Sequence, residues 1–162
     1  MKIRNYTTSI SAIKTITEIE QMLSENKATL IVKEYRGDNR VSAISFRIGE
    51  AGYKLPSNTE KVYQRLKEIT YKSKFLTGVQ KQKLEEQSER VAWRVIRDWL
   101  HAQLSLIYIG QAELEQVMLP YAYDGKRTYY EYIKDKGGIA GLLTNNEDLN
   151  DSLNEKEAEN DE

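Results

Sequence analysis

Five basic or protonatable side chains recur at a spacing that would align them along one predicted helix. They are Lys83, Arg90, Arg94, Arg97 and His101. At about 100° per residue, all five fall within about 40° of Arg90 around the helix axis. Like charges at this spacing repel one another, so this basic strip would suit phosphate groups or an acidic partner. The alternative is a solvated face that carboxylates of other elements neutralise.

A second group combines aromatic rings with cations nearer the C-terminus. Single-stranded nucleic-acid binders stack bases on aromatic rings, while Lys and Arg follow the phosphates. The candidate residues for this role are Tyr121, Tyr129, Tyr130, Lys126 and Arg127. Tyrosine also fills the rim of a small core with its hydroxyl in water, so core packing is the competing interpretation.

Signals for catalysis are poor. His101 is the only histidine and there is no cysteine, so disulfides and thiolate metal sites are excluded. No glycine-rich phosphate loop or nucleophile elbow occurs. Neighbouring carboxylates such as Glu85 and Glu86 fall on predicted helices, where solvated faces are expected. We therefore expect a protein that is not an enzyme and holds no metal ion or cofactor.

Three helix starts carry the pattern of a hydroxyl residue followed three positions later by Glu, which is typical of a capping box. The three pairs are Thr15 with Glu18, Ser57 with Glu60, and Thr128 with Glu131. Apolar residues at helical spacing follow the first two pairs, namely Ile16, Ile19 and Leu23, then Val62, Leu66 and Ile69. Gly137 is expected to end the third helix.

Between the first two helices, the sequence predicts a β-hairpin. Residues 28–35 and 41–48 alternate with period two around a turn at residues 37–39. Pairing Tyr35 with Val41 would put Leu30 beside Phe46, and Val32 beside Ile44, on the buried face. A third strand is expected around residues 53–55, and residues 2–8 could add an edge strand.

The longest predicted element is a helix over residues 79–109, which Gly110 ends. Its apolar residues cover an arc wider than one core-facing stripe, so it should pack on more than one side. It is either central in the domain or part of a homodimer interface that buries Trp93 or Trp99. A shorter helix over residues 111–119 should close at Pro120. The predicted fold class is α+β, a short antiparallel sheet packed against helices.

Charge divides the chain unevenly. Residues 144–162 hold eight carboxylates and one lysine, a net charge of −7, which leaves +6 on residues 1–143 because the whole chain carries −1. The acidic stretch offers little to bury, so we expect a disordered tail after a domain of residues 1–143. No apolar run is long enough to span a membrane or serve as a signal peptide, and we expect a cytoplasmic protein.

The run ERVAWRVIRDWLHAQL at residues 89–104, continuing to residues 119–121, resembles small proteins of tailed phages and mobile genetic elements. The resemblance covers about residues 5–135. It implies a phage or mobile-element setting, and thus a host-cell cytoplasm, but carries no established activity. The acidic C-terminus is similar in layout to that of phage single-stranded-DNA-binding proteins, whose tails compete with DNA.

The leading hypothesis is a binding protein for single-stranded nucleic acid, with the basic strip on phosphates and the acidic tail as competitor. The alternatives are an inhibitor or adaptor that binds a host protein of defence or transcription, and an oligomer that sequesters nucleotides between subunits.

Overall fold

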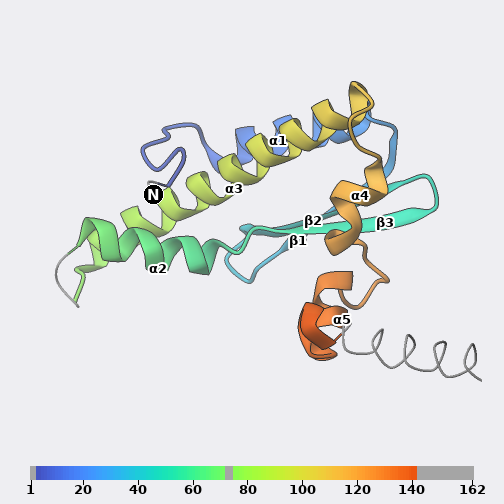
Figure 1. The fold of residues 1–162 in the computed structure, drawn as a ribbon. Helices are drawn as coiled ribbons and strands as arrows, with labels where there is room; N and C mark the ends of the chain where they lie inside the picture. The colour runs from blue at the N-terminus through green and yellow to red at the C-terminus, as the bar shows by residue number, and fades with distance from the viewer. Residues whose placement is uncertain (1–2, 72–74, 142–162) are drawn as a thin grey trace, which may run out of the picture.

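The computed structural model describes residues 3–71 and 75–141, and it confirms the α+β class (Figure 1). The elements follow in the order α1 (Ala12–Glu25), β1 (Ala28–Tyr35), β2 (Val41–Ile48), β3 (Ala51–Pro56), α2 (Thr59–Thr70), α3 (Gly78–Tyr108), α4 (Leu114–Met118), the short 3-10 helix η1 (Leu119–Tyr121) and α5 (Tyr129–Asp135). The three strands form one antiparallel sheet in the order β1-β2-β3.

The long helix α3 is central in the fold. It packs against α1 on one side and α2 on the other, as Figure 1 shows. Trp93 of α3 is fully buried in a core cluster with Ile44 and Phe46 of the sheet. This two-sided packing explains the wide apolar arc. Trp93 therefore belongs to the core, and dimerisation through this helix stays a prediction.

The hairpin has the predicted bounds, but the predicted face of β1 is wrong. Tyr35 does pair with Val41, yet a register shift follows between Glu34 and Tyr35, so Val32 pairs with Ser45. Because side chains alternate along a strand, this one-residue shift turns Leu30 and Val32 to the outer face, where both are exposed.

The outer face of the sheet is held instead by polar contacts around Glu34. Its carboxylate accepts hydrogen bonds from the Ser45 hydroxyl at 3.1 Å and from the Lys54 ammonium at 2.7 Å. Lys54 also lies 4.9 Å from the centre of the Tyr123 ring. Ile31 takes the place on the inner face that had been predicted for Leu30, opposite Phe46.

Two helix starts differ from the capping-box prediction. Helix α1 begins one turn earlier, because the Ser11 hydroxyl accepts from the Lys14 backbone N–H, while Thr15 is buried inside the helix. Helix α2 has Asn58, in a left-handed conformation, as its N-cap, and its side chain makes no capping bond.

The predicted buried residues are confirmed for α1 but only in part for α2. Ile16, Ile19 and Leu23 of α1 are buried as expected. Of the three apolar residues predicted for α2, Leu66 is buried, Val62 is partly buried and Ile69 is exposed. The predicted strand at residues 2–8 is wrong, because its described part, residues 3–8, is turn and coil.

After Gly110, with its positive φ of 76°, a C-terminal unit covers the β3 end of the sheet. The Tyr123 N–H donates to the Gly52 carbonyl at 2.8 Å, which ties this unit to β3. The expected helix of residues 111–119 is shorter, and Pro120 lies within η1. The capping box of Thr128 and Glu131 is confirmed at the start of α5. The predicted boundary at residue 143 and the predicted tail lie outside the described residues.

Among the described residues, no helix is both long and apolar enough to cross a lipid bilayer.

Candidate functional site: paired charges and an apolar groove

The middle of the basic strip is tied to α1 by one carboxylate. Glu18 of α1 accepts from the Arg94 guanidinium at 2.7 Å and from that of Arg97 at 3.1 Å. The Arg94 side chain is only 18% exposed. These two arginines join α1 to α3, a structural role that their spacing along α3 could not reveal.

Asp98 extends the same cluster to the N-terminal segment. It lies 3.2 Å from the Arg4 guanidinium and accepts from the Asn5 side-chain amide at 2.9 Å. Its other oxygen lies 3.4 Å from Arg97. Burial would raise the pKa of Asp98, but the hydrogen bond from Asn5 and the charges of Arg4 and Arg94 outweigh it, so the pKa is lowered.

The remaining members of the strip differ in their surroundings. Arg90 lies 3.5 Å from Glu86, one turn earlier on α3, and donates to Gln87 at 3.2 Å. Lys83 and His101 are exposed. The structure therefore keeps the five residues on α3 but gives three of them carboxylate partners.

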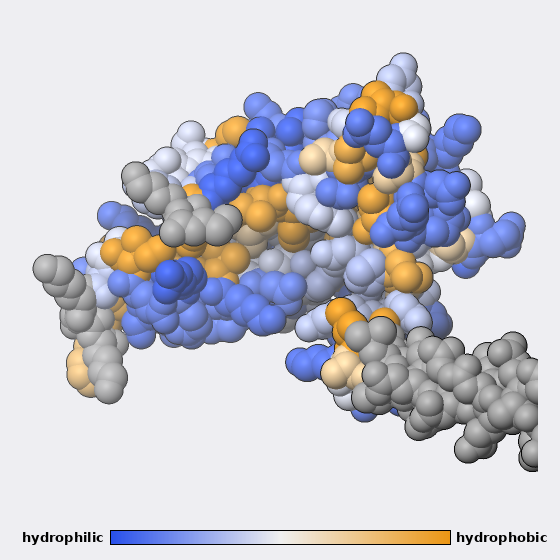
Figure 2. Space-filling view, in the orientation of Figure 1, coloured by the Kyte–Doolittle hydropathy of each residue, from blue (hydrophilic) through white to orange (hydrophobic). Residues whose placement is uncertain are grey.

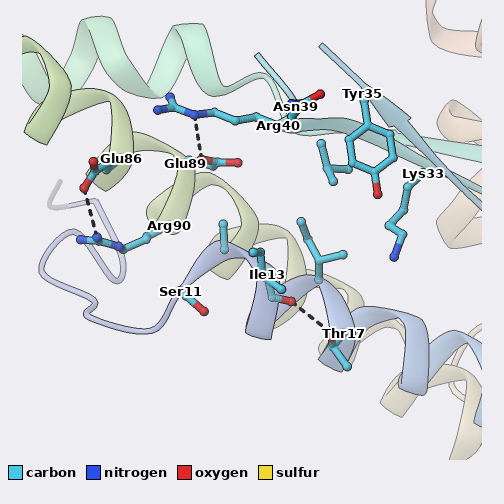
Figure 3. Close-up of a pocket in the computed structure, with 13 residues that line it drawn as sticks. Ser11, Ile13, Thr17, Lys33, Tyr35, Asn39, Arg40, Glu86, Glu89 and Arg90 are labelled. Atoms are coloured by element: carbon cyan, nitrogen blue, oxygen red, sulfur yellow. Dashed lines mark hydrogen bonds and ion pairs between the residues drawn. The ribbon is translucent and has the colours of Figure 1, made fainter. Parts of the chain in front are cut away.

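A polar pocket of about 390 Å³ lies between the start of α1, the hairpin end and α3 (Figure 3). Its lining mixes cations with carboxylates. Figure 3 shows Arg40 directed at Glu89, at 3.5 Å, and Arg90 directed at Glu86. Lys33, on the wall formed by β1, is paired with Glu20 at 2.9 Å. Each cation of this pocket thus already has an anionic partner.

Glu89 is the most enclosed carboxylate of the polar pocket. Burial raises its pKa, and the nearby Arg40 and Arg36 offset only part of that effect. Among the described residues that line this pocket, the groups that a base such as Glu89 could activate are the hydroxyls of Ser11, Thr17 and Tyr35. Ser11 is engaged in capping α1, and Thr17 donates to the Ile13 carbonyl at 3.1 Å.

A second hollow lies on another face of α3, and fewer charged side chains line it than line the polar pocket. This α2–α3 groove, of about 480 Å³, is bounded by β3, α2, α3 and η1. Apolar or aromatic side chains make up most of its lining, including Leu55, Val62, Val95, Ile96, Trp99 and Tyr121. Figure 2 shows apolar side chains gathered in the hollow between α2 and α3. Among the described residues that line it, only Lys61 and Arg65 are charged, and both are basic.

Aromatic packing between α3 and η1 forms one wall of the groove. Trp99 of α3 lies against Tyr121 of η1, with ring centres 5.0 Å apart. Val95, which also lines the groove, is 39% exposed. The groove is thus a preformed apolar surface with a basic rim, the usual form of a site for an apolar segment.

The tyrosine-rich region is divided by the fold. Tyr121 belongs to the groove wall, whereas Tyr129 stacks on Tyr132 at a ring-centre distance of 6.1 Å. Arg127 lies 4.8 Å from the Tyr132 ring centre and 3.3 Å from Asp135. Tyr130 and Lys126 are exposed. The stacking candidates therefore do not share one surface, and Tyr121 is a packing residue.

Within residues 3–71 and 75–141, no three His, Asp or Glu side chains come together in a way that could hold a metal ion. No protein-family model matches the chain, and no curated protein and no solved structure is significantly similar to it.

Sequence reasoning missed the groove as a site. Its signal was present as the surplus width of the apolar arc on α3, which includes Val95, Ile96 and Trp99. The sequence predicts a core position or a subunit interface for this extra apolar width, because neither helix alone shows where α2 lies relative to α3.

Proposed function

We propose that this protein is a non-enzymatic binding protein, an adaptor or inhibitor that receives an apolar segment with acidic flanks in the α2–α3 groove. The single observation that carries the proposal is the lining of the groove, apolar side chains with only Lys61 and Arg65 as charges. Of the two, Arg65 makes an exposed ion pair with Glu68 at 2.8 Å, whereas the central arginines of the basic strip are partly buried and both engaged by Glu18.

An amphipathic helix is the simplest occupant of such a groove. Helix-in-groove recognition buries apolar anchors one turn apart, and each fully buried Leu or Val side chain contributes about 1.5–3 kcal/mol. Acidic residues flanking those anchors would lie near Lys61 and Arg65. Charges at such a rim mainly speed association and exclude basic partners.

The experiment uses a fluorescein-labelled model peptide of about 20 residues, with Leu at helical spacing and Glu elsewhere. Fluorescence anisotropy measures its affinity for the full chain. Val95→Asp, in the groove, should weaken binding at least about tenfold, because it places a charge against apolar side chains. Val32→Asp is the matched control, since Val32 is 43% exposed on the outer face of the sheet.

A peptide with Lys in place of Glu should bind more weakly than the acidic one. Equal loss of affinity in the Val95 and Val32 variants, or no binding by either peptide, would contradict the proposal.

Single-stranded nucleic acid remains a second candidate ligand. The observations in its favour are the exposure of Lys126 and Tyr130 and the position of Arg127, 4.8 Å from the centre of the Tyr132 ring. A labelled oligonucleotide whose affinity drops in a Lys126→Gln, Tyr130→Ala variant, and is unchanged by Val95→Asp, would favour it. The phage or mobile-element setting, the cytoplasmic location and a homodimer stay proposals that rest on the sequence.

A further inference from the structure

We propose that the chain's own C-terminal segment, residues 142–162, occupies the α2–α3 groove and competes there with a partner. This inference rests on the proposed function, because it names an intramolecular occupant of the same site. It differs from competition of the tail at the basic strip. In the groove, leucine side chains would make the main contacts, and the carboxylates of the segment would add contacts to the basic rim.

The sequence of the segment fits the chemistry of the groove. At about 100° per residue, Leu149 and Leu153 each fall within about 20° of Leu142 around a helix axis. A helix that forms on docking would therefore present three leucines along one face. The eight carboxylates among residues 144–162 give it the charge complementary to Lys61 and Arg65.

The described chain ends after α5, which packs against the helix that carries one wall residue of the groove. Tyr121 of η1 lines the groove, and α5 packs against η1. The described chain continues from α5 only to Gly141. Leu149 and Leu153 follow Gly141 by 8 and 12 residues, so they lie at most about 28 Å and about 42 Å from it in an extended chain, or about 12 Å and about 18 Å in a helix.

Tethering makes even weak docking effective. A segment joined by a short linker reaches an effective concentration in the millimolar range, with no need for high intrinsic affinity. The apparent affinity of a partner falls by the fraction of molecules with an open groove, so a groove that is one-tenth open weakens binding about tenfold.

The absence of cysteine from the sequence allows a direct test by crosslinking in the full chain. Val95→Cys is combined with Leu153→Cys, and Val32→Cys with the same Leu153→Cys as the matched control. Dilute protein is oxidised mildly, and the intramolecular disulfide is quantified by mass and by non-reducing electrophoresis. Val62→Cys with Leu153→Cys is a second groove pair, in case the substitution at Val95 disturbs folding.

Both groove pairs should crosslink at least about five times faster than the control pair, because docking raises the local concentration of the two thiols. Leu149→Asp in the groove pair should remove this advantage, whereas Asn150→Asp, which adds the same charge without removing a leucine, should not. Equal rates in groove and control pairs would overturn the inference. A product linked between two chains would also overturn it, because the occupant would then be a second copy.

The acidic model peptide separates this inference from the proposed function. A full chain with Leu149→Asp and Leu153→Asp should bind the peptide several times more tightly than the unaltered chain. Peptide binding that is equal in the two chains contradicts the tail as a competitor but leaves the groove as a binding site. Selective crosslinking without any peptide binding would contradict the proposed function while the intramolecular contact stands.

Discussion

The two faces of α3 carry contrasting surfaces. On the face toward α1, charges are abundant, and Arg94, Arg97 and Asp98 find partners on α1 and the N-terminal segment. On the face toward α2, charges are few, and Val95 and Trp99 line an open groove. A row of cations is conspicuous in a sequence, but the fold gives three of the five residues of the basic strip carboxylate partners, whereas the less conspicuous apolar face lines an open groove.

The largest expected effect comes from removing the carboxylate shared by two arginines. Glu18→Ala should lower the free energy of unfolding by about 2 kcal/mol, because it leaves the partly buried Arg94 without its anion and Arg97 with Asp98 alone. Glu25→Ala, also on α1, removes only an exposed bond from Gln21 and should cost less than about 0.5 kcal/mol. Urea unfolding measures both. Similar losses would show that the charged face does not hold α1 to α3.

A smaller and pH-dependent effect is expected for Asp98→Asn. The folded protein lowers the pKa of Asp98 below its ordinary value of 3.8, so the ionised group stabilises the fold at neutral pH. We expect a loss of about 1–2 kcal/mol at neutral pH. That stabilisation is lost as the pH falls through the lowered pKa, so the difference between the two proteins should shrink below about pH 3.8. A difference that is constant with pH would argue against the ion cluster.

A still smaller effect is expected at the N-terminal end of the strip, where Lys83 is exposed and Arg90 is paired with Glu86 of the same helix. Replacing Lys83 and Arg90 with Gln should leave the salt dependence of oligonucleotide affinity unchanged if the strip is structural. If both residues bind phosphates, the log–log slope should flatten by about 0.7 for each lost contact on a single strand. Anisotropy titrations at several salt concentrations decide between the two. A flattened slope would restore the strip as a nucleic-acid surface.

The smallest expected effect is on stability at two valines, Val95 in the groove and Val32 at the control position. Val95→Asp and Val32→Asp should each change the free energy of unfolding by less than about 1 kcal/mol, because both side chains are substantially exposed. A large loss for Val95→Asp alone would mean that the groove is part of the core.

The sequence predicted those elements whose signals are local. The hairpin bounds, the end of α3 at Gly110 and the capping box of Thr128 depend on neighbouring residues only, and each is confirmed. The face of β1 was mispredicted because the register shift near Glu34 has no local signature. A single extra residue in the pairing is enough to exchange Leu30 for Ile31 on the inner face.

The candidate site was less predictable because its geometry depends on distant pairs. Arg94 and Glu18 are 76 residues apart, and nothing in either helix indicates that they meet. The groove likewise requires Val62 of α2, Trp99 of α3 and Tyr121 of η1 to converge. Helical periodicity identifies which side chains share a face, but not which element lies opposite that face.

The most direct test of the account is a methyl NMR titration of the full chain with the acidic model peptide. The groove contributes the methyl groups of Val62 and Val95, and the polar pocket contributes those of Ile13 and Val41. We predict that the resonances of Val62 and Val95 shift progressively with added peptide while those of Ile13 and Val41 stay in place. Shifts at Ile13 and Val41 with Val62 and Val95 unchanged would contradict the assignment of binding to the α2–α3 groove.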